Sequence, residues 1–183
     1  MKARVTSAIT LTFFLLAIVV FNKSFPPALN IAIALVSVLG VYEIISALGL
    51  AKNCILMIPS LLFAVAFPFL ETSFGREIAY FVYTVIIFTA LIIYHSCTTF
   101  REVGVIYSMS LMIPTALETI VELRTLGGKH GMFYVIIAIF SAWISDMGGF
   151  FAGKLFGKHK LCPDISPKKT TEGVIGSFVL NIA

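Results

Sequence analysis

The chain has 183 residues, of which 59% are hydrophobic and only 12% are charged, and its mean hydropathy is +1.02. A typical soluble domain has about 25% charged residues, so this composition excludes a soluble globular protein. The net charge is a modest +4, and the three cysteines show neither a C-x-x-C pair nor the spacing of zinc ligands. The sequence therefore predicts an integral membrane protein without a disulfide framework or a structural zinc site.

Long apolar runs separated by short polar turns predict an all-α, polytopic transmembrane bundle, because a helix needs about 20 apolar residues to cross a bilayer. The strands of a membrane barrel would alternate apolar and polar residues, and these runs do not alternate. Six spans and the start of a seventh are expected. The six lie near residues 5–21, 29–50, 54–70, 77–95, 103–121 and 132–152. The fifth contains Pro114, where a kink is expected, and the seventh helix begins near Pro167 or Thr171.

The lysines and arginines are distributed unevenly between the two sides of the expected membrane. Nine of the 13 fall on the side that holds the N-terminus and the connection 153–170, and four fall on the other side. The positive-inside rule places the richer side in the cytoplasm. We therefore expect a multi-pass protein of the inner (cytoplasmic) membrane, with the N-terminus and the loop 153–170 in the cytoplasm.

The densest polar stretch of the chain begins at Ser166, which with Pro167 is predicted to cap and start a helix. Lys168 and Lys169 would then occupy the first turn, where a cation loses about 0.3–1 kcal/mol and a bound anion reverses the sign. The two ammonium groups, the Ser166 and Thr170 hydroxyls and free helix N–H groups could converge on phosphate oxygens. An equally weighted alternative is a lysine pair that contacts lipid head groups and fixes the topology.

Asp146 lies within the sixth expected span, about six residues or roughly 9 Å from its cytoplasmic end. An acid inside a membrane usually faces a bundle interior or a wet cavity, so Asp146 is a candidate site residue. Gly149 and Gly153 follow on the same helix face and would let a ligand or a second backbone approach, although helix packing is their commoner use. Glu43 lies at a similar depth and could line the same cavity, but a structural pairing is favoured slightly.

The other titratable residues are predicted to be less important. Glu118 and Glu122 are expected near the opposite membrane surface, and His95, His130 and His159 are expected to be solvated in loops or at span ends. A basic cytoplasmic loop above a buried acid suits a site that joins a phosphate-bearing solute to a membrane-embedded substrate. Phosphoryl and nucleotidyl transfers depend on charge neutralisation and positioning more than on a strong base.

Three motifs in order carry a family resemblance: Asp146-Met147-Gly148, then Gly-Lys-Leu-Phe-Gly-Lys over 153–158, then Ser-Pro-Lys-Lys-Thr-Thr-Glu-Gly over 166–173. This stretch resembles the bacterial phosphatidate cytidylyltransferases, also called CDP-diacylglycerol synthases. The Tyr42-Glu43 pair and the basic start of the chain are similar to that family as well. The resemblance implies a polytopic helical enzyme that converts CTP and phosphatidic acid into CDP-diacylglycerol and pyrophosphate, with Mg²⁺ as cofactor.

The resemblance also implies roles for individual residues. Asp146, Lys168 and Lys169 are expected to be catalytic, and Asp146 is also expected to be a magnesium ligand. Substrate binding would fall to four further residues, and these are Lys154, Ser166, Thr170 and Glu172. Glu172 would orient the lysines or the metal. Thr171 stands where the family often has tryptophan, which weakens the expectation of a stacking or packing role there.

A later family signature, an arginine and paired aspartates after a His-Gly-Gly run, is absent from this sequence. Those aspartates are the principal metal ligands that the resemblance implies. We therefore expect the N-terminal portion of a longer enzyme, inactive by itself. Residues 1–131 would form N-terminal transmembrane helices, and residues 132–183 would begin the catalytic membrane domain.

Two other functions remain open at this point. One is a CTP-dependent kinase similar to polyprenol or phytol kinases, and the other is a non-catalytic membrane protein or transporter whose basic loop binds anionic lipid.

The expected partners are CTP, phosphatidic acid and the lipid bilayer. A homodimer is a further option, and no nucleic-acid partner is expected.

Overall fold

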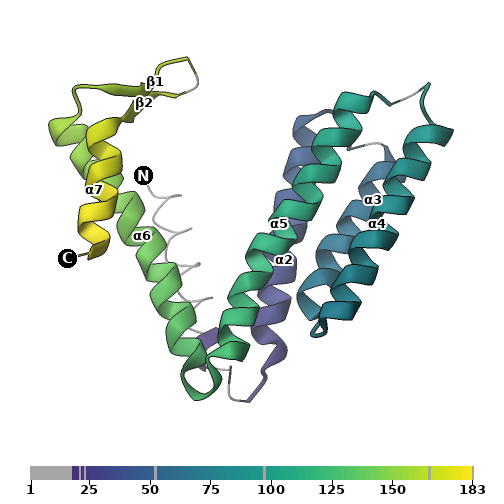
Figure 1. Cartoon of the computed structure of the whole chain (residues 1–183), viewed down its shortest axis with the longest axis horizontal. Coiled ribbons are helices and arrows are strands. Elements are labelled where there is room, and N and C mark those ends of the chain that lie inside the picture. Colours follow the sequence, from purple (N-terminus) through teal and green to yellow (C-terminus); the bar gives the residue numbers. More distant parts are fainter. Residues whose placement is uncertain are drawn as a thin grey trace, which may run out of the picture. The chain divides into compact units, whose positions relative to one another are not determined.

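The computed structural model describes residues 18–20, 22, 24–51, 53–96, 98–164 and 166–182. The first expected span, 5–21, lies almost entirely outside these residues. The described part is helical except for one short hairpin, which confirms the all-α class (Figure 1). The chain consists of two compact units, Met1–Leu126 and Gly127–Ala183. The expected division at residue 131 into N-terminal helices and a catalytic domain stays a prediction.

Four helices make up most of the described part of the first unit (Figure 1). They are α2 (Pro27–Ala47), α3 (Cys54–Ala66) with the 3-10 turn η1 (Phe67–Phe69), α4 (Ser73–Ile93) and α5 (Phe100–Leu126). The helix α4 begins before the expected residue 77 because the Thr72 hydroxyl accepts a hydrogen bond from the Gly75 N–H at 3.1 Å. At the start of α5, the Glu102 carboxylate accepts from the Thr99 N–H at 2.9 Å, as in a capping box. Pro114 lies inside α5 without ending it, and a kink there stays a prediction.

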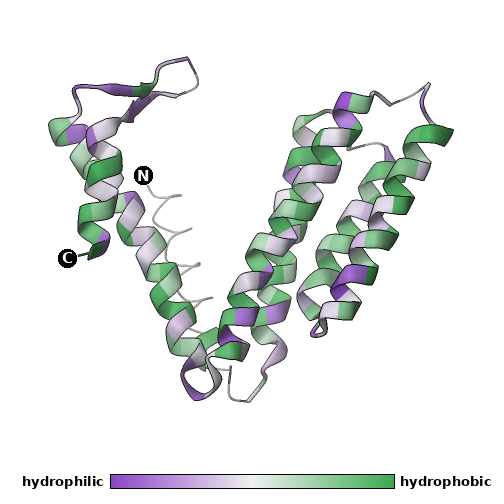
Figure 2. Cartoon of the chain, in the orientation of Figure 1, coloured by the Kyte–Doolittle hydropathy of each residue, from purple (hydrophilic) through white to green (hydrophobic). Residues whose placement is uncertain are grey.

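The lengths and composition of the helices indicate a membrane protein. Four described helical segments are long and apolar enough to cross a bilayer: Pro27–Ala47, Ser73–Ile93, Phe100–Leu126 and Gly128–Phe156. The third expected span is instead a shorter apolar segment, Cys54–Phe69. Figure 2 shows hydrophobic residues along most of the length of the helices, while most of the hairpin of the second unit is hydrophilic. Many of the large hydrophobic side chains are exposed, such as Phe81, Ile92 and Phe150. Such extensive exposed apolar surface is unfavourable in water and favourable in lipid.

Each helix of the first unit contributes to one apolar core. Its fully buried side chains include Val41, Ile45, Leu56, Phe67, Ile87 and Ile106. Phe63 stacks on Tyr83 with ring centroids 4.7 Å apart, and the Tyr83 hydroxyl bonds the Ser60 hydroxyl at 2.9 Å. The polar tip of this buried tyrosine is therefore paired, as burial requires.

An ion pair joins α4 to α5 within the first unit. Arg76 Nη2 lies 2.6 Å from Glu118 Oε1, and Arg76 Nε donates to the Leu70 carbonyl at 3.0 Å. Glu118 is 4% exposed, so it is buried within the protein, and its expected place near the membrane surface stays a prediction. Glu122 is 3.5 Å from the same arginine and its side chain is 44% exposed. The buried contact is the one on which packing depends.

Replacing Glu118 should therefore destabilise the first unit. Glu118→Gln removes the charge that compensates Arg76, and breaking a buried pair typically costs about 3 kcal/mol or more. Glu122→Gln is the matched control, because an exposed pair contributes at most about 1 kcal/mol. Thermal unfolding in detergent micelles measures both. Equal melting temperatures for the two variants would show that burial of Glu118 has no such importance.

The second unit is a helix pair topped by a hairpin (Figure 1). Its elements are η2 (Gly128–His130), α6 (Gly131–Phe156), β1 (Lys160–Cys162), β2 (Ser166–Thr170) and α7 (Thr171–Ile182). The helix α6 extends beyond the expected residue 152. Asp146 therefore lies about ten residues, or about 15 Å, from its end. The connection 153–170 is thus not an irregular loop.

The predicted helix start at Ser166 and Pro167 is wrong, and the alternative start at Thr171 is confirmed. Ser166 lies on β2 opposite Cys162, and Thr170 lies opposite Lys160. Proline is tolerated in such a strand because a two-stranded hairpin has open edges, where a missing N–H costs little. Thr170 caps α7, since its hydroxyl accepts from the Gly173 N–H at 3.2 Å.

Glycines allow α6 and α7 to approach at backbone contact. A Cβ added to Gly148 would lie 2.6 Å from the Gly176 carbonyl oxygen, and one added to Gly173 would lie 2.9 Å from the Gly149 carbonyl oxygen. Small residues are typical of helix interfaces in lipid, where close packing drives association. The packing role expected of Gly149 and Gly153 is supported as well, because an added Cβ would lie 2.7 Å from Ser177 Oγ and 3.7 Å from Gly173 Cα, respectively.

Substituting Gly148 should separate this helix pair. Gly148→Ala forces backbone to move, and overpacking of this kind typically costs about 1–3 kcal/mol. The control is Gly104→Ala in α5, where no atom lies within 4 Å of an added Cβ. There the helix should gain up to about 1 kcal/mol. Melting temperatures in micelles should thus shift in opposite directions, and a neutral Gly148→Ala variant would contradict the packing argument.

Candidate functional site

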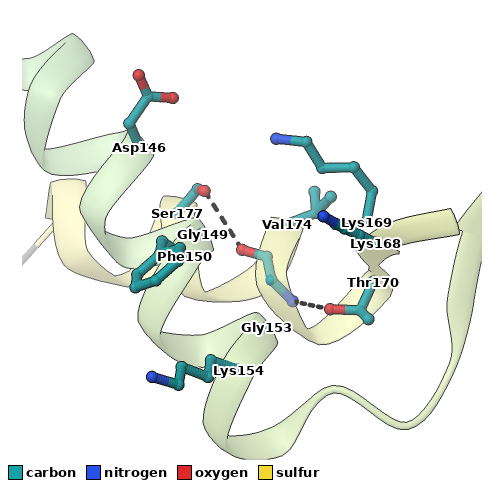
Figure 3. Close-up of a pocket in the computed structure, with 11 residues that line it drawn as sticks. Asp146, Gly149, Phe150, Gly153, Lys154, Lys168, Lys169, Thr170, Val174 and Ser177 are labelled. Atoms are coloured by element: carbon teal, nitrogen blue, oxygen red, sulfur yellow. Dashed lines mark hydrogen bonds between the residues drawn. The ribbon is translucent and has the colours of Figure 1, made fainter. Parts of the chain in front are cut away.

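A cavity of about 560 Å³ lies within the second unit, against α6, β2 and the start of α7 (Figure 3). Its lining combines charged side chains with glycines. The lining residues are Asp146, Gly149, Phe150, Gly153, Lys154, Lys168, Lys169, Thr170, Gly173, Val174 and Ser177. Because glycines supply much of the wall, a ligand can approach the backbone of both helices here.

Five of the seven residues predicted from the sequence line this cavity: Asp146, Lys154, Lys168, Lys169 and Thr170. They come from two elements. The helix α6 supplies the acid and one lysine, and β2 supplies the other two lysines and the threonine. Ser166 and Glu172 are not among the lining residues. The structure thus places five of the seven side chains at one cavity, and the roles expected of all seven stay predictions.

The cavity carries an excess of positive charge. Three lysines and a single carboxylate line it. Within the part of the chain that the structure describes, the ion pairs are Arg76–Glu118, Arg76–Glu122 and His159–Glu172, so none involves these lysines. Unneutralised ammonium groups around a concave surface attract anions, and phosphate groups above all.

Thr170 links the cavity to the helix pair. It is 6% exposed and its hydroxyl oxygen caps α7. A Cβ added to Gly153 would lie 3.0 Å from this hydroxyl oxygen, so the side chain sits tightly against α6. Because α7 begins at Thr171, the carboxylate of Glu172 lies in its first turn, where a negative charge interacts favourably with the helix dipole. Lys168 and Lys169 precede the helix, so they do not occupy its first turn.

Glu172 binds His159, a contact that the sequence did not predict. Its Oε1 lies 2.6 Å from His159 Nδ1, and its two oxygens accept from the His159 backbone N–H at 3.2 and 3.3 Å. These hydrogen bonds from His159 hold the pKa of the Glu172 carboxyl well below its usual range, at about 2. His159 was expected to be solvated. Its side chain is 79% exposed, yet it has a defined partner 13 positions away in sequence.

Ser177 is a further lining residue that sequence reasoning did not single out. Its hydroxyl donates to the Ser145 carbonyl at 2.8 Å, beside Asp146 in the chain. This bond fixes α7 against α6 at the depth of the acid. The spacing of Ser177 one helical turn after Gly173 was the available signal, since both then face α6.

The cavity offers one carboxylate to a magnesium ion. Within the described residues no three histidine, cysteine or acidic side chains converge, and Asp146 is the one carboxylate of the cavity. Mg²⁺ typically binds one or two carboxylates and completes its shell with waters and substrate phosphates. Asp146 beside a phosphate-attracting cavity fits that mode. Glu43, exposed on α2, belongs to the first unit, and its participation stays a prediction.

The low pKa of Glu172 predicts how the hairpin responds to acid. A carboxyl with a depressed pKa stabilises the folded state above its ordinary value of 4.5, and this contribution is lost as pH falls toward about 2. Backbone amides of the hairpin should therefore keep their protection from hydrogen exchange at pH 5 and lose it progressively below pH 4.5. In Glu172→Gln this acid-dependent loss should disappear. An unchanged profile in that variant would assign the acid response to another group.

The helices and the cavity together define a class of protein: a polytopic α-helical membrane protein with a lysine-lined cavity next to a carboxylate. Comparison with known proteins narrows the class. A profile of the cytidylyltransferase family matches residues 2–183, so the chain belongs to that family.

Curated relatives share substantial identity with parts of the chain. The phosphatidate cytidylyltransferase of Bacillus subtilis is 36% identical over 104 residues, which are 57% of this chain and 38% of the relative. That of Haemophilus influenzae is 36% identical over 77 residues, 40% of this chain and 27% of the relative. That of Staphylococcus saprophyticus is 42% identical over 54 residues, which are 30% of this chain and 21% of the relative. The matched stretches thus span less than half of each relative, and no solved structure matches significantly.

Proposed function

We propose that this protein is a phosphatidate cytidylyltransferase, which transfers CMP from CTP to phosphatidic acid and releases pyrophosphate. The observation that carries the proposal is the cavity, which Lys154, Lys168 and Lys169 line together with Asp146. Family membership and the names of the curated relatives support the choice of substrates. The cavity volume of about 560 Å³ is within the range of pockets that hold small-molecule ligands.

The chemistry proposed for this cavity is an in-line displacement. A phosphate oxygen of phosphatidic acid attacks the α-phosphorus of CTP, the bond from that phosphorus to the bridging oxygen breaks, and pyrophosphate leaves. The attacking oxygen is already anionic, so no general base is needed. Negative charge develops on the α-phosphate and on the leaving group, and preorganised positive groups lower the energy of that state most.

The residues of the cavity divide this work. Lys168 and Lys169 contact the triphosphate from β2, while Lys154 contributes from α6 on the other wall. Asp146 would hold Mg²⁺, which neutralises charge on the substrate phosphates when it is bound. The N-terminal amides of α7 add a favourable dipole for anions close to the Thr170 cap.

The same proposal includes a membrane orientation. CTP is a soluble nucleotide of the cytoplasm and phosphatidic acid is a membrane lipid, so the site must meet both phases. We place the hairpin and the lysines at the cytoplasmic face of the inner membrane. Nine of 13 basic residues on that side support the assignment.

Substitution of the cavity residues in the full-length protein tests this function. Lys168→Ala and Asp146→Ala should each lower kcat/KM by about 100-fold, because each removes charge stabilisation in the transition state. Lys160→Ala is the matched control. Lys160 is exposed on the paired strand β1 and does not line the cavity, so its loss should change the rate less than about twofold.

The measurement is formation of labelled CDP-diacylglycerol from radiolabelled CTP and phosphatidate with Mg²⁺ in mixed micelles. Unchanged turnover in Lys168→Ala and Asp146→Ala would remove the cavity from the reaction. A phosphorylated polyprenol in place of CDP-diacylglycerol would assign the protein to a CTP-dependent lipid kinase instead.

A further inference from the structure

The hairpin that carries two of the three cavity lysines has little stability of its own. Its strands have three and five residues, their pairing is irregular between Lys160 and Cys162, and nearly all of their residues are exposed. An isolated two-stranded hairpin is marginally stable in water. The position of Lys168 and Lys169 therefore depends on contacts that the hairpin makes with the helices.

Those contacts gather at one end of the hairpin, next to the start of α7. The Thr171 N–H donates to the His159 carbonyl at 3.1 Å, and Thr170 caps the helix. The Glu172 carboxylate accepts hydrogen bonds from the backbone N–H and from Nδ1 of His159. A carboxylate only accepts hydrogen bonds, so Nδ1 carries the proton in this contact. His159 thus bonds α7 through its carbonyl, its backbone N–H and its ring.

The contact made by His159 lies outside the cavity but close to the lysines along the hairpin. His159 directly precedes β1, and Lys160 at the start of β1 is paired with Thr170, the residue that follows Lys169. A movement of His159 would therefore reach β2 through the pairing of Lys160 with Thr170. Glu172 does not line the cavity, so its effect on the lysines is indirect.

We infer that His159 is a positioning residue, which binds Glu172 on α7 and thereby holds Lys168 and Lys169 in place over the cavity. The inference rests on the proposed function and adds a residue to it. Among the described residues, the hydrogen bonds of His159 go to Thr171 and Glu172, neither of which lines the cavity. Its contribution is the geometry of two ammonium groups that bind substrate phosphates.

This role predicts a particular kinetic signature. Flexible lysines on a loosened hairpin still attract CTP, so ground-state binding changes little. Transition-state stabilisation requires fixed geometry, and a misplacement of about 1 Å can cost up to about 100-fold in rate. His159→Ala in the full-length protein should therefore lower kcat about tenfold and change KM less than about threefold.

Conservative variants and a double-mutant cycle separate positioning from a general structural role. His159→Asn keeps a side-chain N–H near the place of Nδ1 and should restore most of the lost kcat. Glu172→Gln should reproduce the defect of His159→Ala, and the double variant should be no slower than the worse single variant, because both break one contact. Asp164→Asn in the hairpin turn and His130→Ala in η2 are matched controls outside the cavity lining, and both should retain wild-type kcat.

Hydrogen–deuterium exchange of hairpin amides in micelles provides a readout independent of turnover. His159→Ala and Glu172→Gln should speed exchange over residues 160–170 about tenfold, while α6 stays protected. Wild-type exchange together with wild-type kcat in both variants would overturn the inference, and so would additive losses in the double variant. If the wild-type protein forms no CDP-diacylglycerol, the proposed function fails, and the exchange result alone decides whether His159 holds the hairpin.

Discussion

The site depends on one interaction above all, the backbone contact between α6 and α7. Gly148, Gly149 and Gly153 on one helix face Gly173 and Gly176 on the other, so the two backbones approach closely. Small side chains such as Ala152 and Ser177 complete the contact. This approach places Thr170 against α6 and brings β2 beside the helix face that carries the acid. With larger residues at these positions, the lysines and Asp146 would belong to separate surfaces.

The helix pair presents two faces of opposite character. One holds the charged cavity, and the other forms an apolar groove of about 450 Å³ lined by residues such as Phe151, Leu155 and Ile175. The proposed transfer between a nucleotide and a lipid would need this arrangement, because charged groups must stay hydrated while neighbouring helix surface contacts hydrocarbon. The hairpin adds hydrophilic surface at the end of the pair (Figure 2).

The first unit obtains its stability from a different source. Its core is built from large apolar and aromatic side chains, and two polar contacts inside it are the Arg76–Glu118 ion pair and the Ser60–Tyr83 hydrogen bond. The buried Ser37 hydroxyl has no hydrogen-bond partner among the described residues. Polar pairs inside a membrane bundle fix which helix faces meet, since an unpaired group in hydrocarbon is costly. The second unit has few such groups and relies on close glycine packing instead.

The sequence by itself determined the membrane class, the approximate helices, and the cavity residues Asp146, Lys168 and Lys169, because hydropathy and local charge are properties of short segments. It could not determine that Ser166 and Pro167 form a strand, since their local pattern also suits a helix start and only pairing with β1 decides between the two. Tertiary structure alone decided the burial of Glu118 and the partnership of His159 with Glu172. Those contacts join residues distant in sequence, and no local pattern specifies which distant groups a fold brings together.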